Sequence, residues 1–331
     1  MAKVTEIELA LRCMKISGFT FVKNAGKLYI PAREAILSVL PICDEFVIAV
    51  GDNDNDDPTM DIINGIGSDK VRVIHTEWDS DTYTRNTEFA RQTDIAKASC
   101  TGDWLFYIQC DEAVHENDLP KVKAACERFK DDKEVEGFLF RYYHFWGDYT
   151  HYHDDHVWYK KEIRVIRNRK EIHSWKDAQS FRWFTSHDGT FEDYQKKEES
   201  RKLKVVELDA FVYHYGYVRP PMMMTSKTRK NSDSYRGKEA TDEFMKSEPD
   251  LFDYGPLHKL EEFKKTHPAV MKDWISKHDW KDQLQFSGCR NRNRPKHKHE
   301  RMKYRMITWL ENKLNGRKVI GGFKNYDILK R

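Results

Sequence analysis

Two carboxylates follow an apolar run in the first half of the chain. Residues 102–112 read GDWLFYIQCDE, so Asp111 and Glu112 come just after the apolar residues 104–108. A strand that ends in carboxylates presents hard oxygen ligands, which suit Mg²⁺ or Mn²⁺. Phosphate oxygens complete the coordination of such a metal, and the metal can neutralise the charge of a departing diphosphate. Asp111 is therefore a candidate metal ligand.

Polar residues also follow two earlier apolar runs. Lys23 and Asn24 come after the run 19–22, and an acidic loop from Asp52 to Asp57 comes after the run 46–50. In open α/β sheets, ligands bind beyond the carboxyl ends of the strands. Each acidic loop taken alone also fits a solvated turn. Together, the three polar ends predict one shared site.

Strands and helices are expected to alternate through the first half of the chain. Short β-rich apolar runs predict strands at 19–22, 46–50, 71–74, 104–108 and 137–143. Helices are predicted after Pro31, near 59–63, over 86–99 and after Pro120, where the spacing of apolar residues is helical. This alternation predicts an α/β fold with a mixed, mainly parallel sheet that helices cover on both faces.

Composition narrows the class of protein. The 331 residues are 39% hydrophobic and 13% aromatic, which is enough for a sizeable core, and the net charge is only +3. A nucleic-acid-binding chain is usually far more basic, so no nucleic acid partner is expected.

No apolar run is long enough for a membrane-spanning helix. Glu6 and Glu8 interrupt the apolar residues near the N-terminus, unlike in a secretory signal. Six scattered cysteines indicate reduced thiols and a cytoplasmic protein.

Four segments together resemble inverting glycosyltransferases of family 2, which have the Rossmann-like GT-A fold. They are residues 22–24 (VKN), 44–50 (DEFVIAV), 52–59 (DNDNDDPT) and 102–112, and the resemblance covers roughly residues 16–235. It implies an enzyme that moves a sugar from a nucleotide-diphosphate sugar to a hydroxyl acceptor with inversion. The implied acceptor is a glycan or a lipid-linked glycan, and the implied cofactor is Mn²⁺ or Mg²⁺.

The resemblance implies roles for residues near the strand ends. Asp111 would bind the metal, Asp52 would contact the nucleotide together with Lys23 and Asn24, and Asp57 aligns with the aspartate of the family's D-G-T loop. Gln109 stands where the family has the first aspartate of D-x-D, a position that contacts sugar or ribose.

Residues 91–94 (RQTD) correspond to the stretch that covers the nucleotide in this family. Arg91 could grip the diphosphate bidentately, and Gln92 and Asp94 could hydrogen-bond the base or the ribose. The same residues also fit the exposed polar side of an ordinary helix.

The second half contains a further match. Residues 212–220 (VYHYGYVRP) resemble the H-Y-G segment that ends the family's catalytic domain. By this resemblance His214 would be an additional metal ligand, and Arg219 or Lys227 could reach the diphosphate. The spacing of His151, His153 and His156 is compatible with zinc, but no cysteine or acidic residue stands at ligand spacing beside it.

Aromatic and polar residues mix in 138–146 (FLFRYYHFW) and 175–179 (WKDAQ), as suits sugar rings, although Phe138 and Phe140 also fit a core strand. Related sequences place a catalytic carboxylate in this half. Asp177 is our candidate general base, which must lie within hydrogen-bond reach of the acceptor hydroxyl. Other candidates are Glu162, Asp188 and Glu192.

The end of the chain is basic. Residues 254–331 hold 20 Lys and Arg against 8 Asp and Glu, whereas residues 1–253 hold 37 against 46. We expect a catalytic domain over 1–250, with the donor half at 1–118 and the acceptor half at 119–250, and a basic helical extension over 251–331. An amphipathic helix is predicted from an apolar stripe of Met302, Met306, Trp309, Leu310 and Leu314. We expect this stripe to pack on the catalytic domain, while the basic face makes weak peripheral contact with an anionic membrane, on its inner face.

Two other functions remain open. A nucleotidyltransferase has a related sheet, but it needs a Gly-rich basic loop after the first strand, and residues 23–27 (KNAGK) are short and poor in glycine. A non-catalytic carbohydrate-binding protein on the same fold would explain Gln109, because glutamine is a poorer ligand for a hard metal than aspartate.

Overall fold

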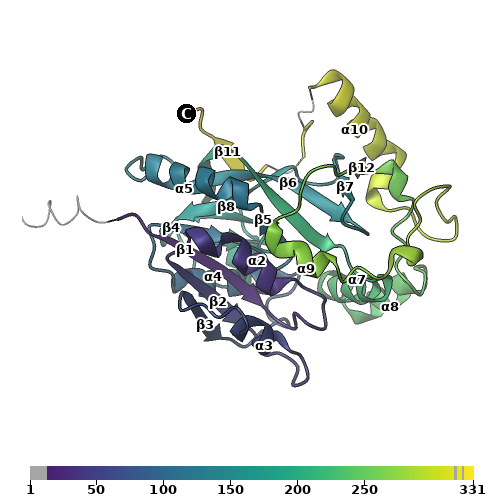
Figure 1. Cartoon of the computed structure of the whole chain (residues 1–331), viewed down its shortest axis with the longest axis horizontal. Helices are drawn as coiled ribbons and strands as arrows, with labels where there is room; N and C mark the ends of the chain where they lie inside the picture. The colour runs from purple at the N-terminus through teal and green to yellow at the C-terminus, as the bar shows by residue number, and fades with distance from the viewer. Residues whose placement is uncertain (1–12, 317–318, 323) are drawn as a thin grey trace, which may run out of the picture.

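A mixed β-sheet runs through the molecule (Figure 1). The computed structural model describes residues 13–316, 319–322 and 324–331. The first half of the sheet is parallel and has the strand order β3-β2-β1-β4. Its strands are β1 (Ile16–Val22), β2 (Glu45–Val50), β3 (Val71–His75) and β4 (Trp104–Tyr107). Their carboxyl ends lie at one edge of the sheet, because parallel strands point the same way.

The second half of the sheet continues in the order β8-β6-β11-β10-β9. β8 runs antiparallel to β4 and to β6, whereas β6 and β11 are parallel to each other. These strands are β6 (Gly137–Trp146), β8 (Lys161–Arg167), β9 (Ile172–Trp175), β10 (Ser180–Phe184) and β11 (Ser200–Tyr217). Four shorter strands are added to these: β5 (Glu112–Val114) and β13 (Tyr326–Ile328) pair with β11, β7 (His151–His153) pairs with β6, and β12 (Glu261–Glu262) pairs with β7.

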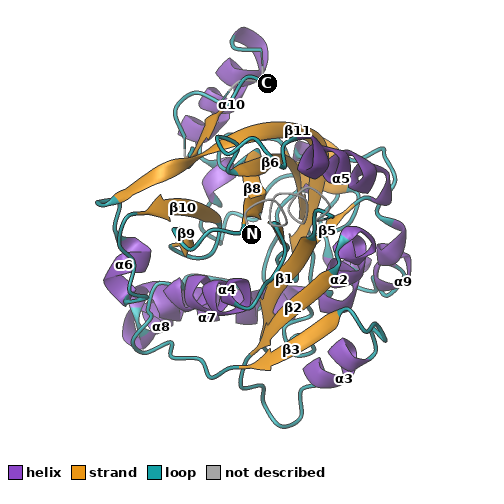
Figure 2. Cartoon of the chain, turned by 90° about the vertical axis from the view of Figure 1, so that its left-hand side faces the viewer, coloured by secondary structure: helices purple, strands orange, loops and turns teal. Residues whose placement is uncertain are grey.

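Helices cover both faces of the parallel strands, with α2 on one side of β1 and β2 and α4 on the other (Figure 2). The α-helices are α2 (Ala32–Val39), α3 (Thr59–Asn64), α4 (Thr87–Ala98), α5 (Leu119–Arg128), α6 (Phe191–Gln195), α7 (Pro221–Arg236), α8 (Lys238–Met245), α9 (Lys272–Ile275) and α10 (Met302–Leu314). Short 3₁₀ helices lie at Leu40–Ile42, Glu116–Asp118, Leu257–Lys259, Ala269–Met271, Lys281–Gln283 and Lys298–Glu300.

Alternate residues of each strand feed two hydrophobic cores. Phe46 and Ile48 of β2 pack with the residues of α2 and α5, while Val47 and Ala49 pack with those of α4 and β10. Phe138 and Phe140 are buried in the first core, which confirms their packing role. A fully buried Phe stabilises the fold by roughly 1.5–3 kcal/mol. The predicted α/β fold with a mixed sheet between helices is confirmed, and it is the arrangement that the GT-A fold implies.

A third core is strongly aromatic and covers the ends of β6 and β11. Phe145 and Tyr215 stack with ring centroids 5.1 Å apart. Side chains from beyond residue 250 close over this pair, including Tyr254, Leu257 and Trp280, all of which are buried. The first part of the basic extension therefore completes the packing around the two longest strands.

The prediction that the apolar stripe of α10 packs on the catalytic domain is wrong. Four stripe residues are exposed, at 73% for Met302, 59% for Met306, 57% for Trp309 and 72% for Leu314. The helix instead docks through polar residues. Thr308 Oγ1 accepts a hydrogen bond from the His156 N–H (3.0 Å), and the buried Glu311 pairs with the His156 ring (2.7 Å). Because polar partners hold this face, the apolar face points outward.

None of the described helices combines the length and the apolar character that a bilayer crossing requires. All six cysteines are free thiols, and Cys43, Cys100, Cys110 and Cys126 are buried.

Candidate active site

The loop between β4 and β5 carries Asp111, and Glu112 anchors it. The Glu112 carboxylate is fully buried and accepts hydrogen bonds from Arg164 at both oxygens (2.8 and 2.7 Å) and from the Tyr142 hydroxyl (2.9 Å). The Tyr215 N–H donates to the Asp111 carbonyl (2.8 Å). Glu112 is thereby committed to the scaffold, and the loop presents Asp111 beside the end of β11.

Asp111 faces three nitrogen-bearing side chains. One carboxylate oxygen lies 3.8 Å from His214 Nε2, and the other lies 3.7 Å from both Arg219 Nη2 and Lys227 Nζ. Burial by itself raises the pKa of Asp111, but attraction to the positive charges of Lys227 and Arg219 outweighs it and lowers the pKa. These separations exceed those of direct hydrogen bonds, so the carboxylate keeps lone pairs for a further ligand.

A chain of hydrogen bonds fixes which nitrogen of His214 carries the proton. His144 Nε2–H donates to the Tyr159 carbonyl (2.7 Å), because that oxygen can only accept. Burial lowers the pKa of His144 and of His214, so both rings are neutral near pH 7. The free Nδ1 of His144 must then accept from His214 Nδ1–H (3.0 Å). His214 Nε2 is left with a lone pair on the side of Asp111.

Gly216 leaves the space around this pair open. A Cβ at this position would lie 2.5 Å from an Asp111 carboxylate oxygen and 2.6 Å from His214 Nε2. Such contacts are too short for real side chains, so residue 216 must be glycine for Asp111 and His214 to keep their places.

Asp111 and His214 fit a divalent metal. A carboxylate oxygen and an imidazole nitrogen suit Mn²⁺, and the hydrogen bond from His214 Nδ1 gives the support that metal-bound imidazoles usually have. Within the described ranges, no third His, Cys, Asp or Glu joins these two. Further coordination would therefore come from water or from a ligand such as a diphosphate.

Arg219 and Lys227 bring more positive charge to the site than the negative charge of Asp111 balances. Arg219 is buried, and its Nε has no hydrogen-bond partner among the described residues. Lys227 Nζ donates to the Gly216 carbonyl (2.7 Å). Burial and then the Arg219 charge lower the pKa of Lys227 to about 7. An anion would relieve this repulsion, so the site suits a negatively charged ligand.

The loop that carries Asp177 is strained and tied to the Asp111 loop. Lys176 and Ala178 on either side of Asp177 have φ of 57° and 60°, a left-handed conformation that costs about 1–3 kcal/mol per non-glycine residue. The Gln109 amide donates to the Ala178 carbonyl (3.2 Å), and the Tyr235 hydroxyl donates to Asp177 (3.3 Å). Burial raises the pKa of Asp177. Strain that the surroundings maintain is typical of functional positions.

The other candidate carboxylates are placed differently. Glu162 is fully buried in β8, accepts a hydrogen bond from Gln179 (3.1 Å), and has its pKa raised to about 7 by burial. Asp188 and Glu192 are exposed around the start of α6. Of these four, Asp177 lies in the loop that the hydrogen bond from Gln109 to the Ala178 carbonyl connects to the Asp111 loop.

Lys23 and Asp52 form a second polar group at the ends of β1 and β2. Lys23 Nζ donates to Asp52 (2.8 Å), whose other oxygen accepts from the Trp78 N–H (3.0 Å). Hydrogen bonding to Lys23 and Trp78 overcomes the effect of burial and lowers the pKa of Asp52. Asn24 has φ of 53° and its side chain accepts from the Asp54 N–H (2.8 Å), which joins the two strand ends.

Asp57 is engaged within the acidic loop. One carboxylate oxygen accepts from the Thr59 N–H (2.9 Å) and hydroxyl, and the other accepts from the Lys27 N–H (2.8 Å). These bonds shape the start of α3.

The three predicted residues of α4 also have protein partners. Arg91 pairs with Glu88 (2.7 Å), and the buried Gln92 donates to the same carboxylate (2.7 Å). Asp94 pairs with His173 of β9 (2.8 Å).

The predicted residues thus fall into distinct groups: Asp111 with His214 and Arg219, Lys23 with Asn24 and Asp52, Gln109 with the Asp177 loop, Asp57 at the start of α3, and the α4 residues with their own partners.

Sequence reasoning missed His144, Gly216 and Tyr235. Gly216 lies inside the H-Y-G segment, so that motif was the available signal. His144 and Tyr235 reach the site only through the pairing of β6 with β11 and the placement of α7. The histidines with zinc-like spacing do not converge, and each contacts its own carboxylate: His151 with Asp148, His153 with Asp155, and His156 with Glu311.

No protein-family model matches the chain, and no curated protein matches it either. Among solved structures, Staphylococcus aureus TarS 1–349 in complex with UDP is 13% identical, with 70% of each chain covered and a TM-score of 0.37. A second S. aureus TarS structure is 11% identical with a TM-score of 0.36 and covers 70% of this chain, which spans 42% of that one.

Glucosyl-3-phosphoglycerate synthase from Mycobacterium tuberculosis, in complex with Mn²⁺, UDP and phosphoglyceric acid, is 15% identical. The similarity covers 43% of this chain and 47% of that one, with a TM-score of 0.28. These similarities are low, and the residues of this chain have to indicate its function.

Proposed function

We propose that the chain transfers a sugar from a nucleotide-diphosphate sugar to a hydroxyl acceptor, with inversion at the anomeric carbon. The observation that carries this proposal is the group around Asp111, where a carboxylate and a neutral imidazole with a free Nε2 meet the buried Arg219 and the half-buried Lys227. A diphosphate with Mn²⁺ or Mg²⁺ would balance these charges. When bound by Asp111 and His214, the metal would neutralise charge on the leaving diphosphate.

The residues of the chain divide the remaining work. The acceptor hydroxyl loses its proton to Asp177 as its oxygen attacks the anomeric carbon. The bond between that carbon and the diphosphate oxygen breaks, and its electron pair leaves with the nucleoside diphosphate. Arg219 and Lys227 stabilise the negative charge that develops there. Attack on the face opposite the leaving group inverts the configuration.

Donor binding involves the strand ends beside this group. Lys23, Asn24 and Asp52 would contact the nucleotide, and Gln109 would contact the sugar or the ribose while holding the Asp177 loop. Four further residues are proposed donor contacts: Asp57, Arg91, Gln92 and Asp94. Each now forms a hydrogen bond within the protein and would have to give it up to contact the donor.

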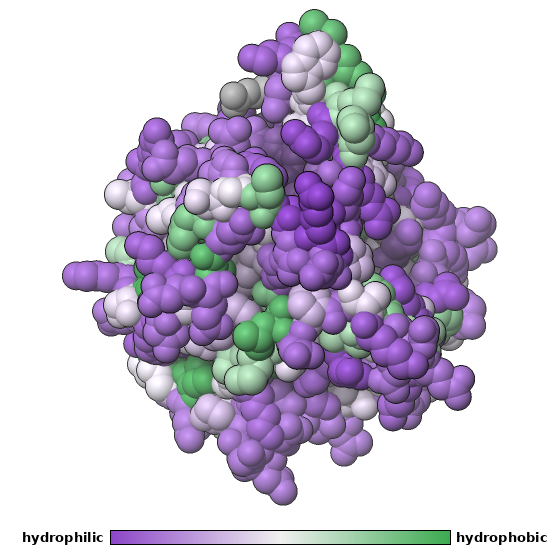
Figure 3. All heavy atoms as spheres, turned by 90° about the vertical axis from the view of Figure 1, so that its right-hand side faces the viewer, coloured by the Kyte–Doolittle hydropathy of each residue, from purple (hydrophilic) through white to green (hydrophobic). Residues whose placement is uncertain are grey.

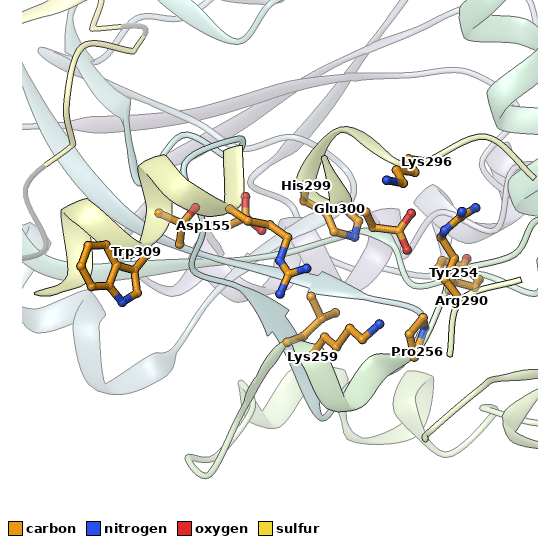
Figure 4. Close-up of a pocket in the computed structure, with 12 residues that line it drawn as sticks. Asp155, Tyr254, Pro256, Lys259, Arg290, Lys296, His299, Glu300 and Trp309 are labelled. Carbon is orange, nitrogen blue, oxygen red and sulfur yellow. The ribbon is translucent and has the colours of Figure 1, made fainter. Parts of the chain in front are cut away.

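A cavity of about 620 Å³ beside α10 supports a lipid-linked acceptor (Figure 4). Basic side chains line it, including Lys259, Arg290 and Lys296, and they would attract an anionic headgroup. Tyr254 in its wall donates a hydrogen bond to the Arg219 carbonyl (2.7 Å). The cavity is thereby connected to the backbone of the active site.

The outward face of α10 supports peripheral contact with an anionic membrane. Figure 3 shows apolar surface on the projecting part of the molecule, where Met302, Met306 and Trp309 are exposed. Exposed basic residues flank this face, namely Arg301, Lys303, Arg305 and Lys313. An apolar face flanked by basic residues suits the boundary between headgroups and acyl chains. The free thiols suit a reducing compartment, so the proposed surface is the cytoplasmic one.

Product analysis tests the proposed reaction. The protein is incubated with UDP- and GDP-sugars and Mn²⁺, and the released compounds are separated by chromatography. A glycosyltransferase releases the nucleoside diphosphate as it transfers the sugar to an acceptor or, slowly, to water. A nucleotidyltransferase, given a nucleoside triphosphate and a sugar phosphate, releases pyrophosphate instead. Binding without release of either compound would favour the carbohydrate-binding alternative and contradict the proposal.

A further inference from the structure

Three side chains able to bind a metal meet away from Asp111 and His214. Asp94 lies on α4, His173 on β9, and His187 in the loop between β10 and α6. Each offers a ligand atom within 4.8 Å of the others, and they form the one such group of three in the described part of the chain. Figure 2 shows α4 beside β9 and β10, with α6 at their end. Elements far apart in the sequence thus converge here.

The carboxylate and the first imidazole are already oriented. Asp94 accepts a hydrogen bond from the Ser174 N–H at one oxygen (2.9 Å), which leaves the other to contact His173 Nδ1 (2.8 Å). A backbone bond that holds a carboxylate in place is the support that metal ligands commonly have. Asp94 and His173 can therefore share a cation with little rearrangement.

His187 brings an unused nitrogen to the same place. Its ring stacks on the His173 ring, with centroids 3.9 Å apart and planes 8° apart, so the His187 ring must turn before both rings can bind one cation in their own planes. Its Nε2 is buried and has no hydrogen-bond partner among the described residues. Leaving a buried polar nitrogen unpaired destabilises the folded protein. A ligand that engages this imidazole would remove that destabilisation.

We propose that Asp94, His173 and His187 bind a zinc-class divalent cation. Two imidazoles and one carboxylate suit Zn²⁺ or Co²⁺, whereas Mg²⁺ prefers oxygen ligands throughout. The cation takes the place of the proton between His173 and Asp94, and the neutral His173 ring then carries its proton on Nε2. Three protein ligands leave a fourth tetrahedral position for water. This site differs in ligand chemistry from the Asp111 group, and a cation there would occupy Asp94 and exclude its proposed contact with the donor.

The cation would fasten the loop between β10 and α6 onto α4. That loop already meets the segment before α4, where the Tyr83 hydroxyl donates to the Gly189 carbonyl (2.8 Å). A ligand that binds only the folded chain raises its stability. The folded protein should therefore gain thermal stability from Zn²⁺ or Co²⁺ through these three residues.

Cobalt spectroscopy tests the proposal on the full chain without a histidine tag. The protein is stripped with a chelator, dialysed and titrated with Co²⁺, and the visible absorption of tetrahedral cobalt is recorded. We expect one equivalent to bind with intense bands, and Zn²⁺ to abolish those bands while excess Mg²⁺ does not. His187→Ala should weaken binding by about 10²-fold or more, since even residues that only support ligands contribute 10–100-fold.

His278→Ala is the matched control, because His278 Nε2 is also buried and has no hydrogen-bond partner in the described part of the chain, but it lies outside the group of three. This variant should bind Co²⁺ as the wild type does. Asp94→Asn, which keeps the size of the side chain, should lose the bands even if His187→Ala fails to fold. Wild-type protein without tetrahedral cobalt bands, or a folded Asp94→Asn variant that keeps them, would overturn the proposal.

Discussion

Gly216 and Asp111 are so close that residue 216 can carry no side chain. A Cβ there would come within 2.5 Å of the Asp111 carboxylate and within 2.6 Å of His214 Nε2. The end of β11 thus packs its backbone directly against the Asp111 loop, where the Tyr215 N–H donates to the Asp111 carbonyl. The open space between Asp111 and His214 depends on this packing.

Gly216→Ala should therefore damage the metal site while the fold persists. The methyl group must displace Asp111 or His214, so we expect the variant to lose most of the extra thermal stability that Mn²⁺ adds to nucleoside diphosphate binding. Differential scanning fluorimetry measures the loss. Gly65→Ala is the control, because a Cβ there meets nothing closer than 3.2 Å. An unchanged Mn²⁺ effect in Gly216→Ala would show that Asp111 and His214 do not act together.

Lys227 should make diphosphate affinity depend on pH. Burial and the Arg219 charge lower its pKa to about 7, so the ammonium carries its charge below pH 7 and loses it above. Only the charged form attracts an anion, so affinity for UDP or GDP should fall by about tenfold or more between pH 7 and pH 9, as for a lost charged hydrogen bond. Isothermal titration calorimetry measures this fall.

Lys227→Met should flatten that profile because it cannot titrate. Lys230→Met, a change at an exposed position of the same helix, should keep the wild-type profile. Equal slopes in the wild type and Lys227→Met would mean that another group controls the pH dependence.

Asp177→Asn should lower turnover by about 10²-fold or more, the usual effect of losing a general base. Donor affinity should stay near that of the wild type, because Asp177 is proposed to contact the acceptor. Burial raises the pKa of Asp177, so wild-type turnover should decline on the acid side as the carboxylate gains a proton. Steady-state kinetics against pH measure both effects.

Asp188→Asn, at an exposed position, should behave as the wild type. Near wild-type turnover in Asp177→Asn would assign the role to another carboxylate.

The outward face of α10 should bind anionic vesicles. Basic residues near such a surface contribute about 1 kcal/mol each, so binding should be strong at low salt and weak at high salt. The double change Met306→Ser with Trp309→Ser should reduce cosedimentation without lowering the melting temperature, because both side chains are exposed. Leu251→Ser, an exposed apolar residue elsewhere, is the control. Full-length protein that ignores anionic vesicles at low salt would contradict the membrane proposal.

Much of the parallel half of the fold follows from local patterns. The runs at 46–50 and 104–108 are buried strands because every residue in them is apolar, and helical spacing after Pro31 marks α2. The second half is harder to predict, because β8, β9 and β10 owe their positions to pairing across long distances in the chain. The orientation of α10 was missed because Thr308 and the buried Glu311, polar residues off the stripe, both contact His156 on the segment after β7.

Site residues that lie within a recognisable motif could be predicted from the sequence. Residues that only the folded chain brings together could not. Asp111 was found from the end of an apolar strand, and His214 and Arg219 were found from the resemblance to the H-Y-G segment; the structure brings the three together. The proton arrangement of His214 depends on His144 and the Tyr159 carbonyl, a relation with no signal in the sequence. Asp94 was expected at the nucleotide, but its nearest partners are on β9, because α4 packs against that strand.

The most direct test of the central claim is the thermal shift caused by UDP or GDP with and without Mn²⁺. A ligand at a hundred times its Kd stabilises a protein by about 2.7 kcal/mol, which is easily measured. The wild type should show a larger shift with Mn²⁺ than with EDTA, Asp111→Asn should abolish the difference, and Asp61→Asn, at an exposed position, should preserve it. Equal shifts in Mn²⁺ and in EDTA for the wild type would contradict metal-assisted binding at Asp111.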